Sequence, residues 1–208
     1  MKQTLLILIL LLTLAFSLNA GEITVSSYDN QIQLLDSNPE HLVMQLTLGH
    51  FTAEPVNINE NTWNLLSLKK EGLTLEAGFP QLPILARSVI IPNTANMELS
   101  VIDTEYVEMT LPVAPSKGNL TRDINPETVP YSFADFYFGN EFWPEEHSYL
   151  TEPFILRDYR GITVRFQPFV YYPATQTLRI YTKLTVALNA NGTDLTNSLP
   201  VPKTSYAE

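Results

Sequence analysis

The stretch Leu178-Arg179-Ile180-Tyr181-Thr182-Lys183-Leu184-Thr185-Val186-Ala187-Leu188 alternates apolar and polar residues along most of its length. Successive side chains of a β-strand point to opposite faces, so this pattern predicts a strand with one face on a hydrophobic core. A second apolar stretch, residues 162–172, precedes it, and the two are separated by Pro173-Ala174-Thr175-Gln176. Because proline favours a tight turn, the sequence predicts a β-hairpin here.

The same alternation recurs earlier in the chain, at residues 42–48, 97–101 and 107–111. No window of eleven or more residues has a convincing helical period, and a short helix competes with a strand only at residues 63–70. The 15 prolines outnumber the 8 glycines, which suits short strands with rigid turns. The sequence therefore predicts an all-β fold over residues 21–188, an antiparallel β-sandwich of jelly-roll type.

The first twenty residues are predicted to be a secretory signal peptide. Lys2 supplies a positive charge, residues 5–16 are almost continuously apolar, and small or polar residues lead to a cleavage site at Ala20. The apolar run is shorter than the roughly 20 residues that a membrane-spanning helix needs, so a retained anchor is the weaker interpretation. We therefore expect a protein exported to the periplasm, the cell surface or the medium, with no membrane contact after cleavage.

Charge and cysteine content exclude several classes of function. The chain has 12 Lys and Arg against 22 Asp and Glu, a formal net charge of -10, so we expect no nucleic-acid partner. It has no cysteine, which excludes disulfides, thiolate metal sites and a cysteine nucleophile within the chain. No metal site or other cofactor is expected.

Two stretches lack a core pattern. Residues 111–138 contain four prolines and no sustained alternation, which predicts a long ordered loop over the surface. Such loops in compact domains are often functional. Residues 189–208 are polar and contain Gly192, Pro200 and Pro202, so they are predicted to be a linker or tail.

Residues with catalytic potential are few. His41, His50 and His147 lack the short spacings of metal ligands, and no serine lies in the glycine pattern of a nucleophile elbow. We expect the three histidines to be structural or solvated, and we expect no catalysis by this chain.

An acidic cluster offers one further possibility. Its members are Glu141, Glu145 and Glu146, with Trp143 and Tyr149 among them. Paired carboxylates next to aromatic rings are typical of carbohydrate sites. A solvated loop anchored by two aromatic side chains is the interpretation that we favour.

Basic residues are scarce, which draws attention to two of them. After Arg87 the next cations are Lys117 and Arg122, both between Pro115 and Pro126 in the proline-rich stretch. A stiff loop that presents a cation has the general form of a substrate-mimicking inhibitor. The alternative, which residue chemistry alone favours, is that both are ordinary solvated cations.

Five blocks of sequence follow one another in a distinctive order. They are Gly-Phe-Pro-Gln-Leu-Pro-Ile-Leu-Ala-Arg (78–87), Ala-Pro-Ser-Lys-Gly (114–118), Asn-Pro-Glu-Thr-Val-Pro-Tyr (125–131), Pro-Phe-Ile-Leu-Arg-Asp-Tyr-Arg-Gly (153–161) and Tyr-Pro-Ala-Thr-Gln-Thr-Leu-Arg-Ile-Tyr (172–181). This order resembles the gingipain propeptide, the N-terminal prodomain of gingipain-type cysteine peptidases of family C25. The resemblance extends over residues 72–188 and is strongest from residue 114 onward, whereas residues 22–70 match weakly.

The resemblance implies a secreted prodomain that assists the folding of a cysteine endopeptidase and covers its active-site cleft in the zymogen. Its partner would be the peptidase catalytic domain, in cis or in trans, and residues 189–208 would lead towards that domain, which this chain does not contain. Because these peptidases cleave after Arg or Lys, the resemblance implies that Arg122 fills the specificity pocket, with Lys117 as second candidate. Lys203 is the candidate processing site.

An exported β-sandwich adhesion or carbohydrate-binding module is the alternative function. Its contact surface would be formed by Trp143, Tyr149 and Glu145.

Overall fold

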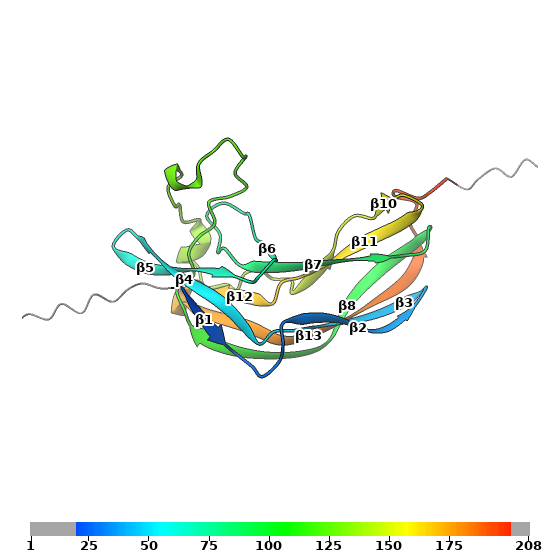
Figure 1. Ribbon diagram of the computed structural model, residues 1–208, viewed down its shortest axis with the longest axis horizontal. Helices are drawn as coiled ribbons and strands as arrows, with labels where there is room; N and C mark the ends of the chain where they lie inside the picture. The colour runs from blue at the N-terminus through cyan, green and yellow to red at the C-terminus, as the bar shows by residue number, and fades with distance from the viewer. Residues whose placement is uncertain (1–19, 201–208) are drawn as a thin grey trace, which may run out of the picture.

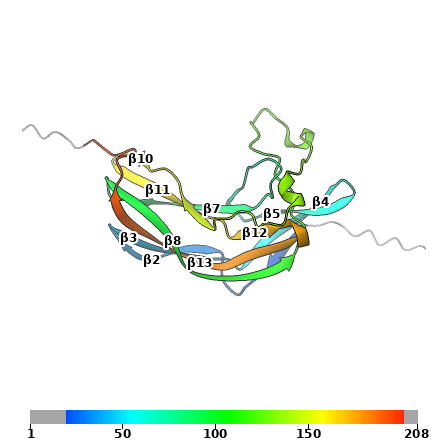
Figure 2. The same cartoon turned by 180° about the vertical axis from the view of Figure 1, so that it is seen from behind.

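Two layers of β-strands enclose the hydrophobic core in the computed structural model, which describes residues 20–200 (Figure 1). The same layering is visible from behind in Figure 2. Every strand pair of the described residues is antiparallel. The prediction of an all-β antiparallel sandwich is therefore confirmed. None of the helices within residues 20–200 is long and apolar enough to cross a bilayer.

Three sheets make up the layers. The first sheet comprises β2 (Gln31–Asn38), β3 (His41–Thr47), β8 (Ala95–Thr110), β12 (Phe169–Tyr172) and β13 (Thr177–Thr193). The second comprises β6 (Gly72–Leu73), β7 (Pro83–Ile90), β9 (Ser148–Leu150), β10 (Phe154–Leu156) and β11 (Tyr159–Phe166). The third comprises β1 (Gly21–Thr24), β4 (His50–Ile58) and β5 (Asn61–Ser67), and it lies at the same end of the molecule as β12 (Figures 1 and 2).

All three sheets contribute to one core. Its buried side chains include Leu46 and Val186 from the first sheet, Leu85 and Val164 from the second, and Phe51 and Leu66 from the third. The rings of Phe51 and Phe169 meet edge to face with centroids 5.3 Å apart, which joins the third sheet to β12. Burial of these apolar side chains supplies the main driving force for a fold that has no disulfide.

Strand β13 is the central strand of the first sheet. It pairs with β8 along one edge, and along the other edge it pairs with β12 and then with β3. The apolar residues that alternate in the sequence are fully buried: Leu178, Ile180, Leu184, Val186 and Leu188. The prediction of a core strand is confirmed.

The predicted hairpin forms only in part. β12 and β13 pair around the turn η3 (Pro173–Thr175), as expected. However, β11 ends at Phe166 and pairs with β7 in the second sheet, so the predicted first strand is divided between two sheets. Pro168 lies at the break, and because proline has no backbone N–H it cannot donate a hydrogen bond to a neighbouring strand.

Two other strand expectations change. The separate strands predicted at residues 97–101 and 107–111 form one strand, β8, that bulges relative to β13. Residues 63–67 of the ambiguous stretch belong to β5 rather than to a helix. β8 is exposed along much of its length, and its acidic residues Glu98, Asp103, Glu105 and Glu108 suit an edge strand that must resist pairing with other chains.

The domain continues past the expected boundary at residue 188. β13 extends to Thr193, and residues 194–199, which we call the C-terminal strap, are held against the sandwich. Asn93 and Leu199 exchange two hydrogen bonds, one from the Asn93 amide to the Leu199 carbonyl and one back from the Leu199 N–H, of 3.0 and 2.6 Å. The expectation of a linker from residue 189 is thus wrong for the strap, while Lys203 and the predicted signal peptide up to residue 19 lie outside the described residues.

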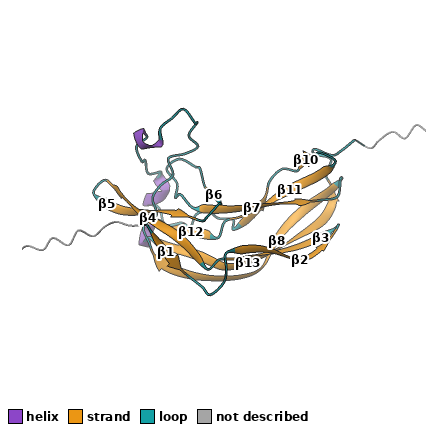
Figure 3. Cartoon of the chain, in the orientation of Figure 1, coloured by secondary structure: helices purple, strands orange, loops and turns teal. Residues whose placement is uncertain are grey.

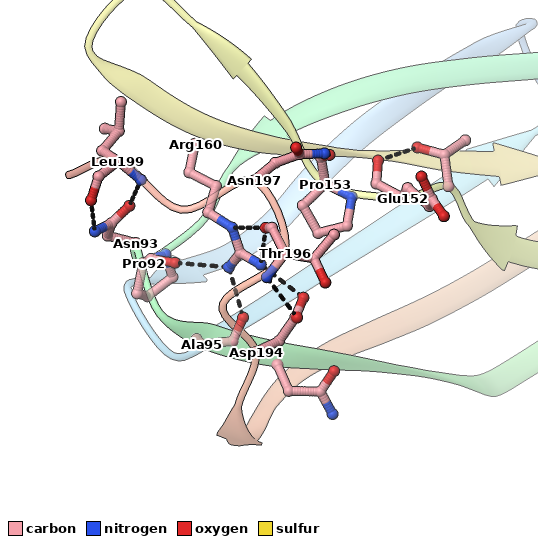
Figure 4. Close-up of polar contacts among 12 residues, drawn as sticks. Pro92, Asn93, Ala95, Glu152, Pro153, Arg160, Asp194, Thr196, Asn197 and Leu199 are labelled. Atoms are coloured by element: carbon pink, nitrogen blue, oxygen red, sulfur yellow. Dashed lines mark hydrogen bonds and ion pairs between the residues drawn. The ribbon is translucent and has the colours of Figure 1, made fainter.

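A buried arginine holds the strap in place (Figure 4). The side chain of Arg160 is fully buried, and its guanidinium donates to the Asp194 carboxylate at 2.6 Å. It also donates to the Ala95 carbonyl at 2.8 Å and to the Thr196 carbonyl at 3.0 and 3.1 Å. Hydrogen bonds from Thr196, together with the Arg160 charge, hold the pKa of Asp194 below its usual value. A side chain outside the predicted core therefore joins β11, β8 and the C-terminal strap.

Candidate functional site

The proline-rich loop, residues 111–138, begins with a buried segment. The Asn64 N–H donates to the Pro112 carbonyl and the Ala114 N–H donates back to Asn64, each at 2.8 Å. The Ser116 N–H then reaches the Phe79 carbonyl at 2.7 Å. Residues 112–116, which we call the outgoing foot of the loop, are hydrogen-bonded between β5 and residues 78–81 and therefore pack like a strand. The expectation of a surface loop throughout is wrong here.

The loop returns to the body through an aromatic cluster. Its last residues form the turn η2 (Asp135–Phe138). The Phe133 and Tyr137 rings both pack on Trp63, with centroids 4.9 and 5.8 Å from that ring. The Tyr137 hydroxyl donates to the Val113 carbonyl at 2.9 Å, and burial raises the pKa of this hydroxyl. Residues 133–138, which we call the returning foot of the loop, are thus fixed to the sandwich. The Tyr137 hydrogen bond also joins them to the outgoing foot.

Between the feet, residues 119–130 form a projecting tip (Figures 1 and 3). This tip is mostly exposed, so local hydrogen bonds give it its shape. Asn125 caps the turn η1 (Pro126–Thr128) by accepting from the Glu127 N–H at 3.0 Å, and the Thr128 hydroxyl donates to the Asn125 carbonyl at 2.8 Å. The tip is therefore ordered without being packed against the sandwich.

Arg122 lies in a tight turn at this tip. The turn is closed by the Ile124 N–H, which donates to the Thr121 carbonyl at 3.0 Å. Arg122 is exposed and forms no ion pair with any residue in the 20–200 range. The neighbouring Asp123 is engaged by the Thr121 hydroxyl, which holds the pKa of Asp123 below its usual value. The guanidinium therefore remains available to a partner.

Lys117 has a different environment. Its ammonium group donates to the Pro126 carbonyl at 2.8 Å and lies 4.3 Å from the centroid of the Tyr131 ring. A contact of this second kind is worth about 0.5–1 kcal/mol at exposed sites. Lys117 thus braces the base of the tip, whereas Arg122 makes no side-chain hydrogen bond, ion pair or cation–π contact with residues 20–200. Residue chemistry had not separated the two.

The acidic cluster is a surface loop held by aromatic packing. The Trp143 ring packs against Phe79 at 5.4 Å, and the backbone of Trp143 exchanges two hydrogen bonds with Tyr171, of 3.0 and 2.8 Å. Glu145 and its acidic neighbours are exposed around a shallow depression of about 460 Å³. Within residues 20–200, no three His, Asp or Glu side chains converge as metal ligands would.

His147 is half-buried beside this cluster. Its Nε2 lies 2.8 Å from the Tyr181 hydroxyl, and the two rings are 4.4 Å apart. Burial, with a smaller contribution from the positive charge of Arg179, lowers the pKa of His147. His41 and His50 instead lie near the surface carboxylates of Asp36 and Glu22, at 3.8 and 3.2 Å.

The environment of His147 makes the stability of the fold depend on pH. Because the folded state disfavours the proton, the unfolded chain binds more protons once the pH falls below about 6.5, and the free energy of unfolding decreases. We expect His147→Gln to show a smaller decrease between about pH 7.5 and about pH 5.5 than the unmodified chain. Urea unfolding at both pH values measures this, and equal decreases for the two proteins would contradict it.

A protein-family model, Propeptide_C25, matches residues 24–199. Gingipain R1 of Porphyromonas gingivalis is 45% identical over 121 residues, which are 57% of this chain and 12% of that protein. Gingipain R2 of strain W83 is 40% identical over 177 residues, which are 84% of this chain and 24% of that protein. The chain therefore spans about a quarter or less of the length of these curated relatives.

Two solved structures share the fold. A complex of the pro- and mature domains of Porphyromonas gingivalis RgpB contains a chain with a TM-score of 0.78 and 32% identity. That match covers 83% of this chain and 91% of the other. A structure concerned with the zymogenic latency of gingipain K gives a TM-score of 0.73 at 14% identity, covering 84% of this chain and all of the other, which is a likeness of fold.

Proposed function

Because this chain belongs to the gingipain propeptide family, we propose that it inhibits a gingipain-like cysteine endopeptidase by inserting Arg122 into the specificity pocket. The chain is a propeptide and not a catalytic domain, and the curated relatives that it matches are several times its length. A zymogen prodomain needs no catalytic groups of its own. It needs a surface that the peptidase binds but does not cleave.

The observation that carries the proposal is the exposed Arg122 on a loop fixed at both feet. A pocket that selects substrate arginine would pair with this guanidinium through two parallel hydrogen bonds. Fixed feet reduce the conformational entropy that binding costs, so the loop is suited to occupy a groove tightly. Lys117, which is engaged with Pro126, would support the tip rather than enter the pocket.

Covalent attachment would strengthen the inhibition. A prodomain joined to its peptidase by a short linker experiences an effective concentration on the order of millimolar, so modest affinity suffices. We propose that the protein is exported with cleavage at Ala20, that it assists the folding of the catalytic domain, and that cleavage at Lys203 separates the two. Covering of the active site until that cleavage would keep the peptidase latent.

The test is direct inhibition in trans. Residues 21–208 are purified and added to an Arg-specific and to a Lys-specific gingipain-type peptidase, with hydrolysis of a small peptide substrate as the readout. We expect inhibition that is competitive with substrate and stronger for the Arg-specific enzyme. No inhibition of either enzyme at about 10 μM, a concentration at which micromolar binding would register, would overturn the proposal.

A further inference from the structure

One large aromatic side chain at the end of the loop is left largely uncovered by residues 20–200. Phe138, the last residue of η2, is 82% exposed, although Phe136 and Tyr137 in the same turn pack on neighbouring rings. The turn therefore fixes the backbone firmly while it directs one ring outward. An exposed apolar group of this size on a fixed backbone is the form that interface anchors take.

Phe138 also borders a pocket of about 280 Å³. Its walls include Ile58 and the rings of Trp63, Phe133, Tyr137 and Tyr171. The Trp63, Phe133 and Tyr137 rings pack on one another with centroids 4.9 to 5.8 Å apart, so the pocket is preformed. Its size and mainly apolar lining suit one aliphatic or aromatic side chain.

The position of Phe138 and the pocket indicates which protein would cover them. Phe138 and two of the pocket walls belong to the returning foot of the loop whose tip carries Arg122. Figures 1 and 3 show that foot directly below the projecting tip, on the side of β5. A protein that receives the tip in its groove would therefore lie over the foot as well.

We infer that Phe138 and the adjacent pocket form a second docking contact for the peptidase catalytic domain, which inserts an apolar side chain into the pocket. This inference rests on the proposed function, because the same partner that takes Arg122 covers Phe138. Arg122 supplies specificity for the active site, and the apolar contact slows dissociation. Burial of Phe138 on binding also explains why so large a side chain is left uncovered in the free chain.

The experiment measures the inhibition constant for an Arg-specific gingipain-type peptidase. We expect Phe138→Ala to raise this constant about 10- to 100-fold, as truncation of an interface anchor does, and Phe138→Leu to restore most of the affinity. Leu156→Ala is the matched control: Leu156 is 65% exposed on β10, at the other end of the sandwich from the loop (Figure 1), and we expect no change. Thermal unfolding of each variant verifies that the fold is unchanged.

Each outcome distinguishes the inference from the proposed function. An unchanged constant for Phe138→Ala, with strong weakening by Arg122→Ala, would overturn the second contact and leave the inhibitor proposal standing. If the unmodified chain does not inhibit at all, the inhibitor proposal fails. If Phe138→Ala instead abolishes self-association in sedimentation experiments without affecting inhibition, the face joins two copies of this chain and the inference is wrong.

Discussion

Replacing Arg160 with methionine is expected to lower the free energy of unfolding by about 3 kcal/mol. Methionine keeps much of the buried volume but cannot donate to the Asp194 carboxylate or to the Ala95 and Thr196 carbonyls. The guanidinium that these acceptors lose is fully buried, while the Asp194 side chain is 26% exposed, and removing one partner is the costly way to break such an ion pair. Urea unfolding followed by circular dichroism measures the change.

Arg87→Met is the matched control for this replacement. The Arg87 side chain is 42% exposed, so its ion pair with Glu71 at 2.7 Å is partly open to solvent. Such pairs contribute about 0–1 kcal/mol, so we expect a small effect. Equal unfolding midpoints for the two variants would contradict the assignment of Arg160 as the residue that fixes the C-terminal strap.

Arg122→Ala is expected to weaken inhibition of the cognate peptidase by about 2–4 kcal/mol, roughly 30- to 1000-fold in the inhibition constant. The alanine variant would leave a pocket that selects arginine without its cation. Arg122→Lys should fall between, because an ammonium group pairs as a point charge and not through a planar fork. Inhibition constants from substrate hydrolysis measure all three proteins.

Two controls accompany this series. Arg157→Asn removes another exposed arginine, in the turn between β10 and β11, and asparagine accepts the backbone φ of 56° found there. We expect it to inhibit like the unmodified chain. The free energy of unfolding of Arg122→Ala should also be unchanged, since Arg122 makes no ion pair within the described part of the chain. Unweakened inhibition by Arg122→Ala would remove Arg122 from the mechanism.

The alternation of apolar and polar residues predicted the core strands well, because one face of each of these strands packs on the core. It did not predict which strands pair, and the stretch from residue 162 to 172 crosses from one sheet to another. The buried outgoing foot of the loop was missed because prolines interrupt its pattern, although its backbone is bonded to Asn64 and Phe79. Pairing between distant segments is a tertiary property that local periodicity does not contain.

The candidate site, too, could be predicted only in part from the sequence. Scarcity of cations, together with the family resemblance, drew attention to Arg122 and Lys117, but only the fold reveals that Lys117 reaches the Pro126 carbonyl. Arg160 is a charged residue next to an apolar stretch, and its burial depends on Asp194 and the strap, which follow β13. Phe138 follows two other aromatic residues in sequence, so nothing in the local pattern distinguishes the exposed ring from the packed ones.

The central claim is that Arg122 occupies the specificity pocket of the peptidase. It is tested most directly by binding to an Arg-specific gingipain-type peptidase whose pocket is already filled by a covalent arginine chloromethyl ketone. We expect the unmodified chain to bind this blocked enzyme about as weakly as Arg122→Ala binds the free enzyme, and blocking to change little for the variant. Binding of the unmodified chain that is equally tight to blocked and free enzyme would contradict the claim.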